Sequence, residues 1–122
     1  MLNEKRAEEL LALTTKMIQA PSYSGQENLV VDVMKKFCGE HKFTDIHVDR
    51  YGNCHIKGMR PGPKILFDGH MDTVPVPDKT KWNHDPFGAE IVDGRMYGRG
   101  TSDMKGALSA MLAAALYYAE DA

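Results

Sequence analysis

The sequence predicts one α/β domain, because helical and strand-like hydrophobic patterns alternate along its 122 residues. Apolar residues recur at intervals of three and four over 3–20, 24–40 and 104–119, which is typical of amphipathic helices. Over 44–57 and 89–97 they recur at every second position, which is typical of half-buried strands. A chain of this length buries roughly two-thirds of its unfolded surface, enough for one core.

The two N-terminal helices are bounded by local signals. Pro21 ends the first helix, because proline cannot continue the hydrogen-bond ladder. Ser24 and Glu27 have the spacing of a capping box and predict the start of the second helix, which continues to about Glu40. We interpret the apolar stripe of each helix as core: Ala7, Leu10, Leu11, Thr14, Met17 and Ile18 in the first, and Leu29, Val30, Val33, Met34, Phe37 and Cys38 in the second.

Two β-hairpins are predicted from alternation and turn residues. In 44–57, the turn falls at 51–53, and we expect His47 and His55 on the exposed face as solvated strand residues rather than metal ligands. In 89–97, Asp93 and Gly94 form the dipeptide favoured in tight hairpin turns.

The last helix, 104–119, carries a wide apolar stripe and many alanines, so we expect it to be largely buried against a sheet. No glycine, asparagine or proline follows it. Glu120 and Asp121 place negative charge at its C-terminal end, where the helix dipole disfavours it. The expectation is therefore a chain cut just after an element.

A candidate metal site begins with His70 and Asp72. They follow the apolar run 64–67, which predicts a short buried strand after a turn at 58–63. Residues two apart in an extended segment point the same way, so the imidazole and the carboxylate should lie side by side. This pairing suits a metal-binding histidine held by a carboxylate, although a solvated turn would show the same triplet.

A second candidate stretch brings an acidic residue to the start of the last helix. The glycine-rich loop 98–102 precedes Asp103, which is either a metal ligand or an ordinary first-turn acid stabilised by free amides and the helix dipole. Lys105 either contacts the carboxylates of the site or is a solvated lysine. We expect Trp82, His84, Pro86 and Phe87 to pack the loop near the site, with substrate contact as the alternative for His84.

These stretches resemble the N-terminal part of the M20 family of zinc-dependent peptidases and deacylases. The matching motifs are GHMDTVP at 69–75, Trp82 with DPF at 85–87, and GRMYGRG at 94–100 running into DMKG at 103–106. The resemblance extends over about 8–115. It is strongest to the branch of acetylornithine deacetylase, succinyl-diaminopimelate desuccinylase and the carboxypeptidase G2-like enzymes, and the motifs do not choose among them.

The resemblance implies a role for each site residue. His70 would ligate one zinc, Asp103 would bridge two metals, and Asp72, the catalytic residue of the set, would orient His70. A complete site would hold two zinc ions, with cobalt or manganese as alternatives, and the peptide bond after Asp103 would be cis. The implied fold is a layered α/β/α domain around a mixed, twisted sheet.

The resemblance also implies what this chain lacks. Residues 1–122 would form a partial metal-binding catalytic domain. The family's glutamate pair, its other ligands, the C-terminal half of the catalytic domain and the lid domain have no counterpart here. A catalytic zinc normally has about three protein ligands, and this chain offers two.

The amino-acid composition limits the classes of partner and the cell compartment that we expect for this chain. Fifteen basic and seventeen acidic residues without a basic run argue against nucleic acid as a partner. No membrane span or secretion signal is visible, and two cysteines, interpreted as buried apolar residues, suit the cytoplasm. Because the family's sheet continues beyond this chain, exposed edges should favour a homo-oligomer.

Two functional hypotheses follow. In the first, the chain is part of a zinc-dependent hydrolase of amide bonds in small N-acyl amino acids or peptides. In the second, it is a non-catalytic truncated fragment or interaction module that keeps the fold without the activity.

Overall fold

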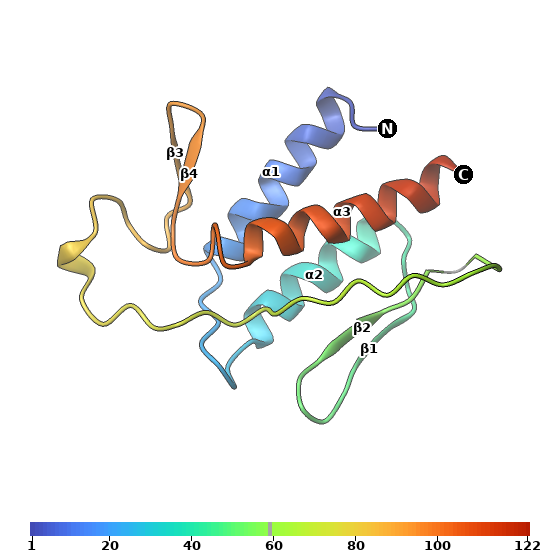
Figure 1. Ribbon diagram of the computed structural model, residues 1–122, viewed down its shortest axis with the longest axis horizontal. Helices are drawn as coiled ribbons and strands as arrows, with labels where there is room; N and C mark the ends of the chain where they lie inside the picture. Colours follow the sequence, from blue (N-terminus) through green and yellow to red (C-terminus); the bar gives the residue numbers. More distant parts are fainter. Residues whose placement is uncertain (59) are drawn as a thin grey trace.

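The computed structural model describes residues 1–58 and 60–122, and its core is a bundle of three helices from which two hairpins project (Figure 1). The helices are α1 (Glu4–Ile18), α2 (Asn28–Glu40) and α3 (Lys105–Asp121), and a short 3-10 helix, η1, covers Lys79–Lys81. The predicted α/β class is confirmed, and all three predicted helices are present. The predicted turn over 58–63 includes residue 59, which lies outside the described residues.

The hydrophobic core lies among the three helices, where α1 packs against both α2 and α3. The buried apolar side chains of this core are Leu13, Met17, Ala20, Val30, Met34, Phe37, Cys38, Phe43, Leu108, Leu112, Ala113, Leu116 and Tyr117. The prediction that the last helix is buried against a sheet was therefore wrong: α3 buries its leucine stripe against helices. Its alanines at 107, 110, 114 and 115 face outward.

Two separate antiparallel hairpins form the strands of the fold. They consist of β1 (Ile46–Val48) with β2 (Cys54–Ile56), and of β3 (Glu90–Val92) with β4 (Arg95–Tyr97). The described residues contain no larger sheet. The structure thus confirms the α/β class. It does not show the predicted layered domain with a mixed sheet, because the strands of the described residues are three residues long and pair only within two separate hairpins.

Both hairpins have the turns and faces that the sequence predicts. Asp93 and Gly94 have φ angles of 50° and 74°, as the two central residues of a tight hairpin turn require. His47 pairs with His55 across the first hairpin, both side chains are exposed, and their rings stack 6.1 Å apart. Their interpretation as solvated strand residues is confirmed.

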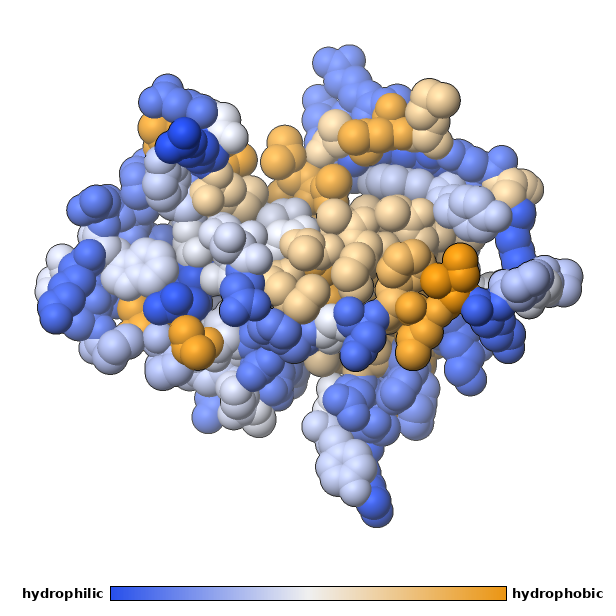
Figure 2. Space-filling view, viewed as in Figure 1, coloured by the Kyte–Doolittle hydropathy of each residue, from blue (hydrophilic) through white to orange (hydrophobic). Residues whose placement is uncertain are grey.

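The predicted buried strand at 64–67 is not formed. This segment is extended but belongs to no strand, and its side chains face solvent, with Ile65 80%, Leu66 89% and Phe67 64% exposed. Figure 2 shows apolar side chains gathered on the same face as α3. The apolar run has the composition of a buried strand, but a strand needs a hydrogen-bonded neighbour, and none is present in the described part of the chain.

The second helix starts later than its capping-box spacing predicts. The residue that precedes the helix is Glu27, whose side chain accepts a hydrogen bond from the backbone N–H of Gly25 at 2.7 Å. Ser24 therefore does not cap α2. Its hydroxyl donates to Asp72 instead, which gives this serine a role in the candidate site.

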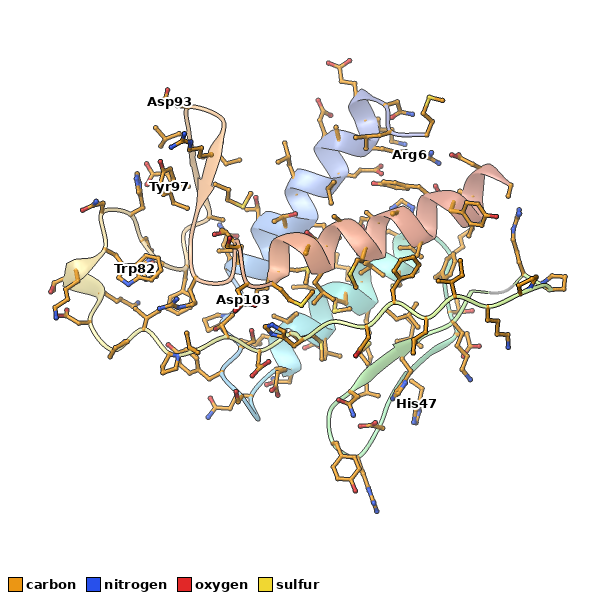
Figure 3. The ribbon with its side chains drawn as sticks, in the orientation of Figure 1. Arg6, His47, Trp82, Asp93, Tyr97 and Asp103 are labelled. Atoms are coloured by element: carbon orange, nitrogen blue, oxygen red, sulfur yellow. The ribbon has the colours of Figure 1, made fainter. Side chains whose placement is uncertain are left out.

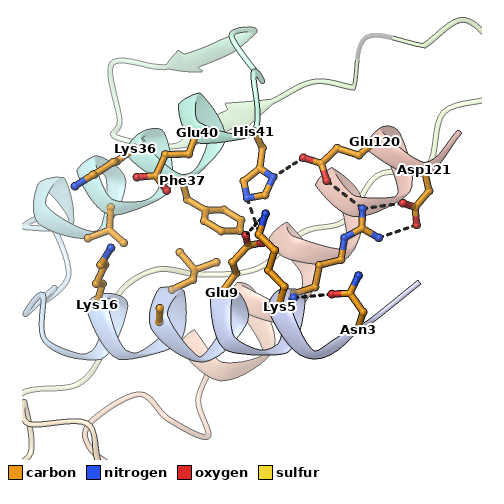
Figure 4. A pocket seen from close by; sticks show the side chains of 14 residues that line it. Asn3, Lys5, Glu9, Lys16, Lys36, Phe37, Glu40, His41, Glu120 and Asp121 are labelled. Carbon is orange, nitrogen blue, oxygen red and sulfur yellow. Dashed lines mark hydrogen bonds and ion pairs between the residues drawn. The ribbon is translucent and has the colours of Figure 1, made fainter.

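A charged cluster joins the ends of α1 and α3 (Figure 4). The guanidinium of Arg6 donates to Glu120 at 3.1 Å and contacts Asp121 at 2.7 Å, and it lies 4.5 Å above the ring of Tyr117. His41 is 2.5 Å from the other oxygen of Glu120. The two acidic residues that the helix dipole disfavours are thus compensated by the Arg6 cation of α1 and by a hydrogen-bonding contact with His41 at the end of α2.

We expect this cluster to make the fold sensitive to acid. Hydrogen bonding to Arg6 lowers the pKa of Asp121, and hydrogen bonding to His41 and then to Arg6 lowers the pKa of Glu120. Carboxylates with lowered folded-state pKa values stabilise the fold above their ordinary values of 3.8 and 4.5, and this stabilisation is lost as the pH falls through the lowered values. The N-terminal amine and Glu9 also face the cluster.

The measurement is urea unfolding of the wild type and Arg6→Met at neutral pH and at about pH 3. The wild type should lose more stability on acidification than Arg6→Met, because the variant lacks the cation that lowers both pKa values. Lys16→Met, at the other end of α1, is the control and should behave as the wild type (Figure 4). An equal loss in Arg6→Met would contradict the role of the cluster.

Among the described residues, no helix is long and apolar enough to cross a membrane. Both cysteines are free thiols: Cys38 lies in the core, as expected of a small apolar residue, and Cys54 is partly buried.

Candidate metal-binding site

His70, Asp72 and Asp103 lie together although 33 positions separate the histidine from the second aspartate. His70 and Asp72 follow the extended segment, and Asp103 lies in the loop that leads into α3, where Figure 3 labels it. The Nε2 atom of His70 is 2.9 Å from Oδ1 of Asp103, and its Nδ1 atom is 3.2 Å from Oδ1 of Asp72. The structure therefore brings the three sequence-predicted residues into one cluster.

Asp72 defines the orientation of the imidazole. Nδ1 of His70 is 3.0 Å from the backbone oxygen of Asp72 and also close to its carboxylate, so both neighbours of this nitrogen are acceptors. Nδ1 must then carry a proton, and Nε2 faces Asp103. The hydrogen bond to the Asp72 backbone, followed by that to Asp103, raises the pKa of His70.

Ser24 holds Asp72 from the other side, and sequence reasoning missed this contact. Its hydroxyl donates to Oδ2 of Asp72, while Oδ1 faces His70. The serine hydrogen bond is the largest cause of the lowered pKa of Asp72, ahead of the effect of His70. Asp72 is therefore kept ionised with one oxygen directed at the imidazole.

The loop between α1 and α2 supports the part of the site that contains His70 and Asp72. The backbone N–H of Thr73 donates to the Ser22 carbonyl at 2.8 Å, and the Ser22 hydroxyl donates to the Met71 carbonyl at 2.7 Å. Ser22 is fully buried, and Tyr23 forms an isolated parallel bridge with Thr73. These contacts place Asp72 beside Ser24.

Lys105 anchors the start of α3, next to the loop that carries Asp103, to the end of the first helix region. Its side chain is 1% exposed, and its ammonium donates to the carbonyl of Ala20 at 2.8 Å. Burial lowers the pKa of Lys105 to about 8. Both sequence interpretations were wrong, because the described residues contain no carboxylate within ion-pair distance of this lysine and it is not solvated.

Glycines let the loop before α3 approach its neighbours closely. Gly100 has a φ of 91°, and a Cβ there would lie 2.9 Å from the Thr73 methyl group. A Cβ on Gly106 would lie 2.3 Å from the carbonyl oxygen of Thr101. The Asp103–Met104 peptide bond is cis, as the resemblance implies, and the Met104 sulfur accepts from the backbone N–H of His70 at 3.4 Å.

The cluster lines an open cleft of about 220 Å³ between 70–74 and 98–103. His70 is 48% exposed and Asp103 86% exposed, measured on their side chains. The carboxylate of Asp103 therefore projects into the cleft with only one of its oxygens hydrogen-bonded to His70.

The aromatic loop packs beside the cleft, as predicted. Arg99 lies 5.0 Å from the ring of Trp82, which Figure 3 labels, and donates to the Pro75 carbonyl. His84 is 2.8 Å from a carboxylate oxygen of Glu90 and stacks on Tyr97 with ring centroids 3.9 Å apart. His84 thus has the packing role expected of it rather than a place among the metal-site residues.

His70 and Asp103 supply two donors of kinds that a divalent metal ion accepts. An imidazole nitrogen and a carboxylate oxygen are both accepted by zinc, cobalt and manganese. Two such donors on one tetrahedral zinc lie about 3.4 Å apart, so Nε2 of His70 and Oδ1 of Asp103, at 2.9 Å, would need to separate by about half an ångström. The exposed carboxylate allows this movement. Nevertheless, the described residues contain no group of three or more histidine, cysteine, aspartate or glutamate side chains arranged to hold a metal.

Comparison with known proteins shows which protein family this chain is similar to. Residues 66–122 match the model of peptidase family M20/M25/M40. The chain is 40% identical over 114 residues to succinyl-diaminopimelate desuccinylase 1 of Ruegeria sp. (strain TM1040), covering 89% of this chain and 30% of that protein. It is 36% identical over 115 residues to succinyl-diaminopimelate desuccinylase of Cereibacter sphaeroides (strain ATCC 17029 / ATH 2.4.9), covering 91% of this chain and 30% of the relative.

The chain thus spans about 30% of the length of the curated relatives it matches. The matched region contains both halves of the cleft, His70 with Asp72 and Asp103 with the loop before α3. The chain is therefore an M20-family segment, and that family is one of amidohydrolase-type enzymes.

Proposed function

We propose that this chain supplies part of the active site of a zinc-dependent hydrolase of amide bonds. The observation that carries the proposal is the 2.9 Å approach of the His70 Nε2 atom to the Asp103 carboxylate, with Asp72 behind the other ring nitrogen. A metal-binding histidine commonly has a carboxylate partner of this kind. His70 and Asp103 are the ligands in this proposal, and Asp72 is the positioning residue.

The residues of this chain would prepare the site in two ways. Asp72, held by Ser24, keeps one proton of His70 on Nδ1, so that Nε2 is the nitrogen that would bind a metal once it gives up the proton it donates to Asp103. The carboxylate of Asp103 is largely exposed, and its second oxygen would be available to hold a second metal ion. When bound, a zinc ion would polarise the amide carbonyl and activate a water molecule near neutral pH.

The proposed substrates are small N-acyl amino acids or peptides. The names of the relatives specify removal of a succinyl group from diaminopimelate, and an N-succinyl amino acid is therefore the first substrate to test. The cleft of about 220 Å³ is open enough to admit a small molecule beside His70 and Asp103. The two free cysteines suit the reducing cytoplasm proposed for this enzyme.

The test uses a hybrid enzyme in which this chain replaces the matching segment of the Ruegeria relative. The hybrid should hydrolyse an N-succinyl amino acid, lose activity on dialysis against a chelator, and regain it when zinc is added back, since ligand-held metal is exchangeable. A folded hybrid that keeps its activity after metal has been removed and shown to be absent would overturn the proposal.

A second function is favoured by the small number of ligands. Two donors in the described residues are fewer than the three that a catalytic zinc normally has. As it stands, this chain then acts as a non-catalytic module, and its surface rather than its cleft is functional. The result expected for this function is the absence of metal-dependent hydrolysis both in the 122-residue chain and in the folded hybrid.

A further inference from the structure

The carboxylate of Asp72 is held through both of its oxygens. Its Oδ1 atom lies 3.2 Å from Nδ1 of His70, and its Oδ2 atom accepts the hydrogen bond of the Ser24 hydroxyl. The Asp72 side chain is 36% exposed, so water competes for both oxygens. An aspartate held at one oxygen only can still turn, because its terminal torsion has just a broad preference. The second contact, from Ser24, is the one that stops this rotation.

The position of Ser24 is itself fixed by a turn. The backbone N–H of Gln26 donates to the Tyr23 carbonyl at 2.8 Å, which closes a turn over 23–26 with Ser24 as its second residue. Gly25 follows with a φ of 84°, which glycine adopts without strain, and its N–H donates to the Glu27 carboxylate at 2.7 Å. The Ser24 hydroxyl therefore projects from a backbone whose conformation is set locally.

The residue two positions earlier ties this turn to the chain on both sides of Asp72. The Ser22 hydroxyl donates to the Met71 carbonyl at 2.7 Å, and the Ser22 carbonyl accepts from the Thr73 N–H at 2.8 Å. Ser22 is fully buried, so these bonds are shielded from water. The distance between the Ser24 hydroxyl and Asp72 is thus fixed by the backbone and not by one flexible side chain.

The segment 20–24 also contacts the half of the site that carries Asp103. The ammonium of Lys105, two positions after Asp103, donates to the Ala20 carbonyl at 2.8 Å, and Lys105 is 1% exposed. One short segment is therefore bonded to both halves of the cleft. All of these contacts are formed within the described residues, and they position Ser24 relative to His70 and Asp103 together.

The partner of the Ser24 hydroxyl is unusual for a serine in a turn. Serine hydroxyls commonly bond to backbone groups a few residues away. The Ser24 hydroxyl donates instead to a carboxylate 48 positions along the chain. Hydrogen bonds to ionised groups are stronger than those between neutral groups, so this contact can hold a partly exposed side chain.

We infer that Ser24 is a positioning residue of the metal site, which acts through Asp72 to keep the imidazole of His70 directed at Asp103. The inference rests on the function proposed above, in which His70 and Asp103 bind the metal. Loss of a group that orients a metal-binding histidine commonly costs about 10- to 100-fold in metal affinity or activity. Because Ser24 acts one contact further away, its loss should weaken zinc binding by about tenfold.

Four variants separate the hydroxyl from the shape of the side chain. Ser24→Ala and Ser24→Val remove the hydroxyl, whereas Ser24→Thr keeps it and has nearly the same shape as the valine variant. Gln26→Ala is the control, since it removes an exposed side chain of the same turn and leaves the bond to Asp72 in place. Circular dichroism checks that each variant is folded.

The first measurement needs neither metal nor activity. Three-bond NMR couplings of the metal-free 122-residue chain report the side-chain rotamer of Asp72. The wild type, Ser24→Thr and Gln26→Ala should each show one dominant rotamer. Ser24→Ala and Ser24→Val should show couplings averaged over several rotamers, because the carboxylate is then free to turn towards water.

The second measurement is the zinc dependence of hydrolysis in the hybrid enzyme. The zinc concentration that gives half of the maximal rate should rise by about tenfold in Ser24→Ala and Ser24→Val, and Ser24→Thr should restore it. The KM for the N-succinyl amino acid at saturating zinc should stay unchanged, because Ser24 lies outside the set of described residues that line the cleft. A mere loss of folded protein would lower the maximal rate without moving the zinc midpoint.

Couplings of Asp72 that are the same in the wild type and Ser24→Val overturn the inference, and so do equal zinc midpoints in Ser24→Thr and Ser24→Val. Either result leaves the zinc-dependent hydrolysis of the parent hybrid intact. A folded hybrid that is active without metal overturns the proposed function instead, and the couplings of the metal-free chain still decide whether Ser24 fixes Asp72.

Discussion

Replacing His70 or Asp103 with alanine is expected to abolish amide hydrolysis in the hybrid enzyme. Each change removes one of the two donors that face each other at 2.9 Å in the cleft. Metal ions contribute several kcal/mol to stabilisation of a transition state, so turnover should fall by about a thousandfold or more. The measurement is the steady-state rate of hydrolysis of an N-succinyl amino acid at saturating zinc.

Matched substitutions distinguish loss of a ligand from loss of the fold. His47→Ala removes a solvated histidine of β1, and Asp32→Ala removes an exposed carboxylate of α2. Both variants should keep the rate of the parent hybrid. Near-normal turnover in folded His70→Ala or Asp103→Ala would eliminate that residue as a metal ligand.

The second large effect is expected for Gly106→Ala, which should destabilise the chain and displace Asp103. The added Cβ would lie 2.3 Å from the backbone oxygen of Thr101, and a backbone atom cannot turn away as a flexible side chain can. The loop before α3 must shift to remove this overlap, at a cost of about 2–3 kcal/mol. Urea unfolding followed by circular dichroism measures the loss.

Gly39→Ala is the control, because Gly39 is also a helical glycine and has nothing within 4 Å of the added Cβ. Alanine is the better helix former, so this variant should gain about 0.5–1 kcal/mol of stability. The two glycine-to-alanine changes should therefore have opposite signs. Equal effects would show that the contact with Thr101 is not tight.

Sequence patterns correctly predicted the helices and turns that are determined by residues close together in the sequence. The helices over 4–18 and 28–40 follow from apolar spacing, and the turn at Asp93 and Gly94 follows from the need for positive φ angles. The segment 64–67 has the composition of a buried strand, yet it is exposed. Local pattern could not reveal this, because whether an apolar segment becomes a strand depends on a pairing partner elsewhere in the molecule.

In the candidate site, too, contacts between sequence neighbours were predicted, whereas contacts between residues far apart in the sequence were not. The His70 and Asp72 pair is predicted from a spacing of two in an extended segment, whereas Asp103 was assigned through the family resemblance. Ser24 reaches Asp72 across 48 positions, and Lys105 reaches Ala20 across 85. No periodicity encodes contacts of that range, and the local signals of both residues favoured other roles.

Calorimetric titration of zinc into the purified chain, with His70→Ala in parallel, tests the central claim that His70 and Asp103 are metal ligands. Two donors should give weak but saturable binding at one site, and the variant should lose it. Binding that is equally strong in His70→Ala, or no saturable binding by the wild type, would contradict the claim.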